Sequence, residues 1–303
     1  MPAARKTLLV ILGPTGVGKT GTAIEVARSF ETAILSCDSR QVYQEMRIGT
    51  AAPGPRELAA VPHYFVRTIP VTRPYNCWEF AREALELLEE LFSRHDAVIM
   101  AGGSMLYIDA VCRGIDEMPD VDPETRATIE RLYAGEGNEA SRRLLQELDP
   151  AYYRQVDLAN TRRVTRAIEV CLATGQPYSS LRSGRRHRRD FSIVKIGLQR
   201  DRQELYDRVN ERVEQMVAAG MEEEARGLYP HRHLNALNTV GYKEWFDYFD
   251  GKISREEAIR QIKRNTRHYA RKQLSWFRRD HEITWFHPSR AGDIISFARE
   301  STR

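Results

Sequence analysis

The feature that most constrains this chain is a glycine-rich segment near its start. Residues 13–20 read Gly-Pro-Thr-Gly-Val-Gly-Lys-Thr and fit the pattern G-x-x-x-x-G-K-[ST]. A continuous apolar run, Leu8 to Leu12, precedes this segment, and Lys19 to Phe30 follows with apolar residues at helical spacing. A strand, loop and helix of this kind turn backbone N–H groups and the positive end of a helix dipole toward phosphate oxygens. The segment therefore predicts a site for a diphosphate or triphosphate.

Two side chains of this segment have expected roles in the phosphate site, in addition to the backbone N–H groups. Lys19 supplies a full positive charge, and the hydroxyl of Thr20 is suited to ligate Mg²⁺, the one cofactor that we expect. The predicted diphosphate-binding residues of the segment are Gly13, Pro14, Thr15, Gly16, Val17, Gly18, Lys19 and Thr20.

Strands and helices are expected to alternate along much of the chain. An amphipathic helix is predicted over 78–92, and further strands are predicted at 33–37, 63–66, 97–101, 191–198 and 283–286. Such alternation is typical of an α/β protein in which helices cover both faces of a parallel sheet. We therefore expect a doubly wound parallel sheet of the P-loop NTPase-like class.

A purely helical segment interrupts this alternation. Residues 116–189 contain helical patterns at 123–133, 138–148 and 160–173 but no strand pattern. We interpret the segment as a small all-helical insertion domain. The expected organisation is a first part of the core at 1–115, the insertion at 116–189, and the remainder of the core with basic C-terminal helices at 190–303.

The position of the nearest carboxylate helps to separate the reactions that such a loop supports. ATP-driven motors and switches usually end a later strand in a magnesium-holding acid, but the strand near 97–100 runs into Ala-Gly-Gly-Ser without a carboxylate. The acid stands instead at Asp38, where the second strand ends and where α/β sheets place their ligands. A general base, a helix N-cap and a water-mediated magnesium ligand are all open roles for it.

Two arginines are further candidates for this site. In the helix predicted at 203–219, an apolar stripe runs along one face, and Arg208 and Arg212 border it. An arginine that leans toward a core needs an anion. The diphosphate and an ordinary ion pair with a carboxylate are both open for each of them.

Positive charge is concentrated in two segments, although the net charge is only +4. Residues 160–189 hold eight arginines against one acid, and residues 254–279 hold nine lysines and arginines against two glutamates. Helical spacing in the second segment separates an apolar face from a cationic ridge made of Arg260, Arg264, Arg267, Arg271 and Arg278. A solvated face normally mixes both signs, so these two segments favour a polyanionic partner.

Composition excludes several other classes of protein. With 42% hydrophobic and 29% charged residues, the 303-residue chain has the composition of an ordinary globular protein. Its longest apolar runs are far shorter than the roughly 20 residues that span a bilayer, and we expect no signal peptide. Four cysteines without a C-x-x-C pair and scattered histidines predict no zinc site. We expect a cytoplasmic protein with no membrane contact.

Several further motifs, which occur in order along almost the whole chain, resemble those of one known family. They are Asp-Ser-Arg-Gln-Val-Tyr (38–43), Ile-Gly-Thr-Ala (48–51), Val-Pro-His-Tyr (61–64), Gly-Gly-Ser-Met-Leu-Tyr (102–107), residues 162–170 with Thr-Gly-Gln-Pro (174–177), Val-Gly-Tyr (240–242) and residues 265–278. Together with the glycine-rich segment, they resemble the tRNA dimethylallyltransferases, also called tRNA isopentenyltransferases, in their bacterial form. One departure is Ser104, where the family more often has threonine, and the hydroxyl is retained.

The resemblance implies an enzyme with a defined reaction. It would transfer a dimethylallyl group from dimethylallyl diphosphate to the exocyclic amine of the adenosine on the 3′ side of the anticodon, position 37 of tRNA, and release pyrophosphate. The glycine-rich segment, Mg²⁺ and an arginine would stabilise the leaving group, while Asp38 would take a proton from the amine. The implied catalytic residues are Asp38, Lys19, Thr20 and Arg208, with Arg212 as the alternative arginine on the diphosphate.

The resemblance also implies contacts with tRNA. An adenine in a stacked anticodon loop reaches such a site only if it is flipped out, and basic surfaces must hold the displaced stem-loop. The implied tRNA-binding residues are Asp38, Ser39, Arg40, Gln41, Ser104, Arg126 in the insertion, Arg162, Arg163, Val164, Thr165, Arg166, Asn238, Thr239, Val240, Gly241, Tyr242 and Lys243. The expected partners are the tRNA anticodon stem-loop and dimethylallyl diphosphate, bound by a monomer.

Other functions fit parts of the same pattern. A small-molecule kinase of P-loop fold would also need Lys19, Thr20 and a base at Asp38, but it would use ATP and would not require two basic segments. An adenine-nucleotide prenyltransferase, acting on free nucleotides, would need the same site without the RNA surface. A catalytically idle RNA-binding module would need neither a donor nor a base.

Overall fold

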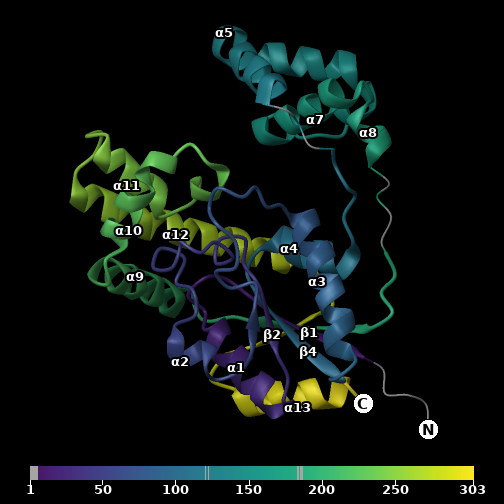
Figure 1. Ribbon diagram of the computed structural model, residues 1–303, viewed down its shortest axis with the longest axis vertical. Helices are drawn as coiled ribbons and strands as arrows, with labels where there is room; N and C mark the ends of the chain where they lie inside the picture. The colour runs from purple at the N-terminus through teal and green to yellow at the C-terminus, as the bar shows by residue number, and fades with distance from the viewer. Residues whose placement is uncertain (1–5, 120, 122, 183, 185–186) are drawn as a thin grey trace. The chain divides into compact units, whose positions relative to one another are not determined.

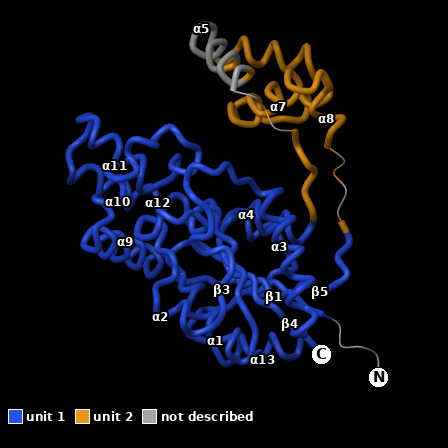
Figure 2. The backbone as a smooth tube through the Cα atoms, in the orientation of Figure 1, with its two compact units in different colours: residues 1–113, 188–303 blue, residues 114–187 orange. Residues whose placement is uncertain are grey.

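The chain divides into two compact units, residues 1–113 together with 188–303, and residues 114–187 (Figure 2). A computed structural model of the protein describes residues 6–119, 121, 123–182, 184 and 187–303, and within 123–137 it describes side chains only at 125 and 129. The predicted insertion, 116–189, begins and ends two residues later than the second unit.

None of the helices in the described ranges combines the length and the apolar character needed to cross a membrane.

The first unit is built on one parallel sheet (Figure 1). In order across the sheet, its strands are β3 (His63–Tyr64), β2 (Ile34–Cys37), β4 (Ala97–Gly102), β1 (Thr7–Leu12), β5 (Ser192–Leu198) and β6 (Ile283–Phe286). Every neighbouring pair is parallel, which confirms the predicted α/β class. The strand order changes direction at β1, between β4 and β5. The loop after β1 therefore opens at the carboxyl edge, where such sheets bind ligands.

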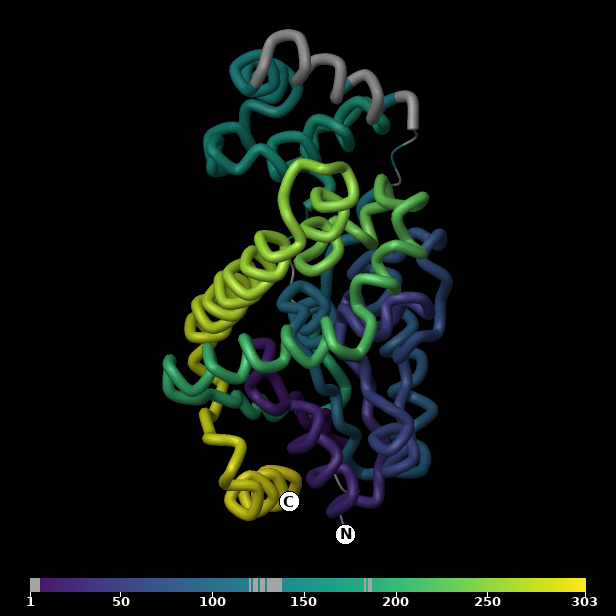
Figure 3. Tube along the Cα trace, turned by 90° about the vertical axis from the view of Figure 1, so that its left-hand side faces the viewer, coloured from purple at the N-terminus to yellow at the C-terminus, as the bar shows by residue number. Residues whose placement is uncertain are grey.

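Helices flank this sheet in the first unit. They are α1 (Lys19–Ser29), α2 (Pro55–Leu58), α3 (Cys77–Phe92), α4 (Met105–Arg113), α9 (Arg202–Ala218), α10 (Met221–Leu228), α11 (Tyr242–Phe249), α12 (Arg255–Phe277) and α13 (Ala291–Ser301), with short 3₁₀ turns at Tyr229–His231 and Asn235–Leu237. α1 packs beside α13, and α3 packs beside α4. The long helix α12 contacts α9, α11 and α4 (Figure 3), so it joins the C-terminal helices to the sheet.

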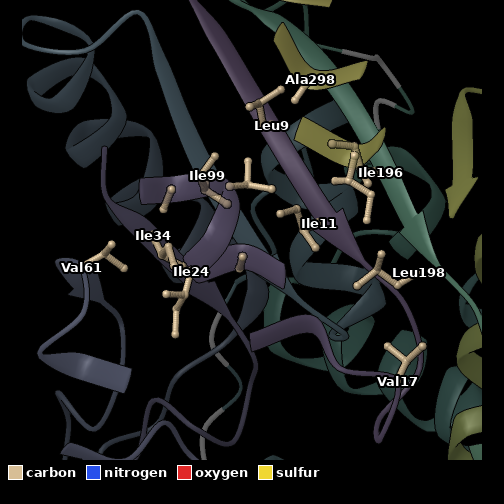
Figure 4. Close-up of a cluster of buried hydrophobic side chains, with 14 of the residues drawn as sticks. Leu9, Ile11, Val17, Ile24, Ile34, Val61, Ile99, Ile196, Leu198 and Ala298 are labelled. Atoms are coloured by element: carbon tan, nitrogen blue, oxygen red, sulfur yellow. The ribbon is translucent and has the colours of Figure 1, made fainter. Parts of the chain in front are cut away.

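The face of the sheet that carries α1 and α13 is filled with aliphatic side chains (Figure 4). Leu9 and Ile11 of β1 and Ile99 of β4 pack there. Successive side chains of a strand point to opposite faces, so Leu8 and Val10 point the other way, and they are also fully buried. Burial on both faces explains why β1 is a continuous apolar run rather than an alternating pattern.

A second hydrophobic core anchors the segment that follows β2. Val42, Tyr43 and Met46 of this segment are buried in one cluster with Trp245 and Phe246 of α11. The chain just after Asp38 is therefore fixed at one end by the sheet and at the other by the helices of the C-terminal part.

One predicted strand is shorter than expected. The pattern predicts a strand at 63–66, but β3 ends at Tyr64. Phe65 has a φ of 60°, a left-handed conformation that a strand does not accommodate, so the prediction was wrong at its last two residues.

The second unit consists of helices. They are α5 (Pro123–Leu148), α6 (Pro150–Tyr153), α7 (Thr161–Thr174) and α8 (Tyr178–Leu181). Ile129, Leu145 and Ile168 belong to its hydrophobic core. The prediction of two helices at 123–133 and 138–148 was wrong, because α5 is continuous. The two glycines between these patterns, Gly135 and Gly137, cost only about 1 kcal/mol each inside a helix, and α5 packs against α7.

The close approach of β2 and β4 generates a stability prediction. Cys37 pairs with Gly102, and a Cβ at Gly102 would lie 1.9 Å from the Cys37 carbonyl oxygen. We expect G102A to lower the free energy of unfolding by about 1–3 kcal/mol or more, because backbone atoms must move apart. Chemical denaturation measures this change.

Gly227 in α10 provides the matched control, since a Cβ there meets no atom within 4 Å. G227A should leave stability unchanged or raise it by up to about 1 kcal/mol through helix propensity. Equal stability of G102A and the wild type would contradict the described strand pairing.

Candidate active site

The glycine-rich loop, residues 13–20, lies at the carboxyl end of β1 and leads into the first turn of α1. Gly13 and Gly16 have φ values of 151° and 81°, which favour glycine. Space is also restricted, because a Cβ at Gly13 would lie 2.6 Å from the carbonyl oxygen of Leu198. The loop is therefore shaped both by its own backbone and by its contact with β5.

Lys19 is held across this loop. Its Nζ donates hydrogen bonds to the carbonyl oxygens of Gly13 (3.0 Å) and Pro14 (2.9 Å). Burial lowers the pKa of Lys19 to about 8; nearby Asp38 opposes this shift, and Arg212 adds to it. The site thus holds a lysine whose charge is poorly solvated, and such a group gains from an anionic ligand.

Thr20 follows in the first turn of α1 and is half-buried. Within the described ranges, its hydroxyl has no hydrogen-bond partner among protein groups. A free hydroxyl at this end of the loop would fit as one oxygen ligand of an Mg²⁺ held largely by phosphate oxygens and water.

Asp38 comes directly after β2 and is half-buried. Its Oδ1 accepts hydrogen bonds from the backbone N–H groups of Arg40 (2.9 Å) and Gln41 (3.3 Å). These bonds form a turn, so the helix N-cap considered from sequence is not its role. The other carboxylate oxygen accepts no hydrogen bond from any described group, which leaves it available to a substrate.

Ser104 connects the Asp38 turn to the end of β4. Its Oγ accepts a hydrogen bond from the N–H of Ser39 (2.8 Å), and its own N–H donates to the carbonyl of Cys37 (3.3 Å). Ser104 is 7% exposed. It therefore holds the turn around Asp38 rather than presenting its hydroxyl to solvent.

The two candidate arginines of α9 reach different parts of the site. Arg208 is exposed, and its Nε donates to the carbonyl of Gly16 in the glycine-rich loop (3.1 Å). Arg212 is more buried, and it donates to the carbonyl of Ala51 (3.3 Å). Burial lowers the pKa of Arg212, and Asp38 opposes that shift. Neither arginine is in an ion pair with a carboxylate in the described part of the chain.

Glu224 is a residue of the site that the sequence did not predict. Its carboxylate accepts the backbone N–H groups of Arg47 (3.0 Å), Ile48 (2.7 Å) and Gly49 (2.8 Å), and also the hydroxyl of Tyr242 (2.7 Å). The turn that it holds continues to Thr50 and Ala51, whose carbonyls accept the side-chain amide of Gln41 (3.1 and 3.2 Å). Its partners lie far away in sequence, so no local pattern marks it.

The residues predicted to contact tRNA differ in how far they are exposed to solvent. In the first unit, Asn238 and Lys243 are exposed, and Ser39, Arg40, Thr239 and Val240 are half-buried. In the second unit, Arg162 and Arg163 are exposed at the start of α7, whose N-cap is Asn160, and Thr165 is half-buried. The side chain of Arg126 lies outside the described residues.

Four of these residues are buried or are bound by other protein groups. Val164 is 2% exposed and Tyr242 is 0% exposed, so neither side chain presents a surface to RNA, and Gly241 is buried beside Tyr242. Arg166 binds Glu169 (3.3 Å) and the carbonyl of Pro119 (3.3 Å). Their assignment to tRNA binding remains a prediction from resemblance.

Helix α12 presents the cationic ridge that the sequence predicts. Arg264, Arg271 and Arg278 are exposed, while Arg267 binds Asn210 (2.6 Å). Arg260 forms an ion pair with Glu257, so one position of the ridge is neutralised. In the other basic run, Arg185 and Arg186 lie outside the described residues, and Arg189 donates to the carbonyls of Val111 and Ala110 (2.8 and 3.1 Å).

A glycine-rich loop at the strand-order change of a parallel sheet, with a half-buried lysine, two arginines and a free carboxylate oxygen around it, is typical of an α/β enzyme with an anion-binding site. The sequence profile described as IPP transferase matches residues 41–280. The chain is 51% identical over 298 residues to tRNA dimethylallyltransferase 1 of Bacteroides fragilis, covering 98% of this chain and 99% of that protein. It therefore belongs to the IPP transferase family of tRNA dimethylallyltransferases.

Other relatives agree with this assignment. The chain is 54% identical over 282 residues to tRNA dimethylallyltransferase 2 of Porphyromonas gingivalis, covering 93% of this chain and 94% of that protein. Among solved structures, it is similar to the full-length tRNA isopentenylpyrophosphate transferase of Bacillus halodurans, with a TM-score of 0.73 and 34% identity over 98% of this chain and 97% of the other.

The lowered pKa of Lys19 predicts how ligand affinity depends on pH. In the free protein Lys19 is charged below about pH 8 and neutral above it. A bound diphosphate favours the charged lysine and so raises this pKa; affinity must therefore fall as pH rises above about 8. We expect the Kd for dimethylallyl diphosphate to increase by up to about tenfold per pH unit over that range, as titration calorimetry measures.

The variant K19R is the matched control for this prediction. Its guanidinium stays protonated over the same range, so its affinity should not show the decline. A wild-type Kd that does not change above pH 8 would contradict the lowered pKa.

The hydrogen bonds of Ser104 predict a difference in stability between two variants at this position. S104A removes the acceptor of the Ser39 N–H and leaves a partly buried donor without a partner. We expect this change to lower the free energy of unfolding by about 1–3 kcal/mol in chemical denaturation. S104T retains the acceptor oxygen and should cost less. If S104A proves no less stable than S104T, Ser104 does not hold the Asp38 turn in this way.

Proposed function

We propose that this protein transfers a dimethylallyl group from dimethylallyl diphosphate to the exocyclic amine of adenosine 37 in tRNA and releases pyrophosphate. The observation that carries the proposal is the free carboxylate oxygen of Asp38 beside Lys19 and Arg212, at the carboxyl edge of the sheet. β4, in contrast, ends without a carboxylate. Membership of the family supports the proposal.

The reaction breaks the allylic C–O bond, so negative charge develops on the departing diphosphate. Lys19, the N-terminus of α1 and an arginine of α9 are the groups that would stabilise this charge. Arg208, which touches the loop, is favoured as that arginine, and Arg212 is the alternative nearer to Asp38. The Thr20 hydroxyl, with diphosphate oxygens and water, would hold Mg²⁺. A bound Mg²⁺ would supply further charge neutralisation at the leaving group.

The acceptor amine needs help because its lone pair is delocalised into the purine ring. As the N–C bond forms, the nitrogen loses a proton, which the free Asp38 oxygen would accept. The N–H groups of Arg40 and Gln41 hold the other oxygen, so the carboxylate keeps one orientation during the transfer. The atoms balance: one C–O bond is replaced by one C–N bond, and the proton passes to Asp38.

The RNA substrate would be bound by the exposed cations of each unit. In the first unit these are Arg264, Arg271 and Arg278 of α12 with Lys243, and in the second unit they are Arg162 and Arg163 of α7. Phosphate contacts of this kind supply affinity without reading sequence. Adenosine 37 would enter the site flipped out of the anticodon loop. The cytoplasmic location and the monomeric state stay predictions.

A direct assay tests this function. The protein is incubated with an unmodified tRNA transcript, dimethylallyl diphosphate and Mg²⁺, and both pyrophosphate release and the mass of adenosine 37 are measured. No pyrophosphate release would overturn the proposal. Phosphorylation with ATP would instead identify a kinase, and equal modification of free AMP would identify a nucleotide prenyltransferase.

The variant D38N sharpens this test. Asparagine retains an oxygen for the N–H groups of Arg40 and Gln41, but it cannot accept the proton. We expect the rate of transfer to fall by about 10²–10⁴-fold, with the melting temperature unchanged. Affinity for pyrophosphate should not weaken, since a negative charge near the diphosphate has been removed. Unchanged activity of D38N would exclude Asp38 as the base.

A further inference from the structure

The basic helix α12 carries a polar residue that is buried within the protein. Gln273 is 2% exposed, although it lies among the cations of the ridge. Its Oε1 accepts the backbone N–H of Thr15 (2.8 Å), and its Nε2 donates to the carbonyl of Gly103 (2.9 Å). A single amide therefore joins the glycine-rich loop after β1 to the turn after β4.

The surroundings of Gln273 leave little freedom for this amide. A Cβ at Gly103 would lie 2.4 Å from Nε2 and 3.3 Å from the carbonyl oxygen of Gly13, so the backbone turns approach the side chain closely. The partners also fix its orientation, because rotation of the amide by 180° would oppose two donors on one side and two acceptors on the other. A buried amide that is satisfied on both sides makes a rigid connection.

The connection continues to the base. Gly103 is followed by Ser104, whose Oγ accepts the N–H of Ser39, next to Asp38. Thr15, Gln273, Gly103 and Ser104 thus form a continuous path of hydrogen bonds and one peptide link. One end of this path lies in the loop that would hold the leaving diphosphate. Its other end lies at the turn that would hold the base.

Group transfer depends on the separation of these two ends. The acceptor nitrogen and the leaving oxygen must lie on opposite sides of the allylic carbon, and misplacement by about 1 Å can cost about 10²-fold in rate. We propose that Gln273 is a positioning residue that sets the distance between the diphosphate loop and the Asp38 turn. This inference rests on the proposed prenyl transfer and adds to it a residue that touches neither substrate.

The proposal predicts that Gln273 variants lose rate rather than affinity. Q273M keeps the length of the side chain and removes both hydrogen bonds. Q273E keeps the acceptor for Thr15 but places a carboxylate oxygen against the Gly103 carbonyl. For both variants we expect the single-turnover rate at saturating donor and anticodon stem-loop RNA to fall by about tenfold or more. The Kd for Mg²⁺-pyrophosphate and the KM for RNA should stay within about threefold of the wild type.

Gln261 on the same helix provides the matched control. Its Nε2 donates to Glu257 one turn away (2.7 Å), without a contact to the site. Q261M should keep the wild-type rate. Melting temperatures of all variants, and rates repeated well below the lowest of them, separate a loss of position from a loss of folded protein.

The outcomes of these experiments distinguish failure of the proposed function from failure of the inference about Gln273. If the wild type releases no pyrophosphate, the proposed function fails, and this inference fails with it. If the wild type is active and Q273M transfers as fast as Q261M, only the inference is overturned. It is also overturned if the whole loss in Q273M appears in the Kd for Mg²⁺-pyrophosphate, because Gln273 would then shape the diphosphate loop alone.

Discussion

The parallel pairing of β1, β4 and β2 is the constraint on which the site depends. Their registers place Leu12 opposite Gly102, and Gly102 opposite Cys37, so three strands end in one row. The glycine-rich loop, the Ser104 turn and Asp38 each begin where one of these strands ends. Without side chains at Gly102 and Gly103, the turns approach closely enough to share hydrogen bonds. The close pairing of strands that Gly102 and Gly103 permit therefore brings together groups from distant parts of the chain.

The close approach of these strand ends also affects the electrostatics of the site. Lys19 and Arg212 are both desolvated, and their pKa values are both lowered by burial, while Asp38 opposes the shift of each. Lys19, Arg212 and nearby Arg208 outnumber the two carboxylates that act on them, Asp38 and Glu57, so the site is short of negative charge. An anionic ligand would correct this imbalance in a medium where electrostatic interactions are stronger than in water. The same surroundings would stabilise negative charge that develops on a leaving group.

The basic residues divide into those that bind protein groups and those that face solvent. Arg189 and Arg166 donate to backbone carbonyls, and Arg260 is paired with Glu257. Arg264 and Arg271 on α12 are exposed, as are Arg162 and Arg163 on α7. A count of arginines thus overstates the cationic surface, because a guanidinium has five donors and often satisfies carbonyls at the ends of elements. The exposed groups on α12 lie on the helix that also carries Gln273.

The sequence by itself determined the glycine-rich loop, the parallel α/β class, Asp38 and the cationic ridge. Each follows from local patterns: glycine spacing, apolar runs, the end of a strand and helical periodicity. It did not separate Arg208 from Arg212, because both border the same apolar stripe, and it missed Glu224. Only the tertiary structure decided that Glu224 holds a turn of the site and that Arg208 contacts Gly16 while Arg212 contacts Ala51, because these contacts join elements that are far apart in the sequence. Gln273 is 258 residues from its partner Thr15, and no local rule acts over that distance.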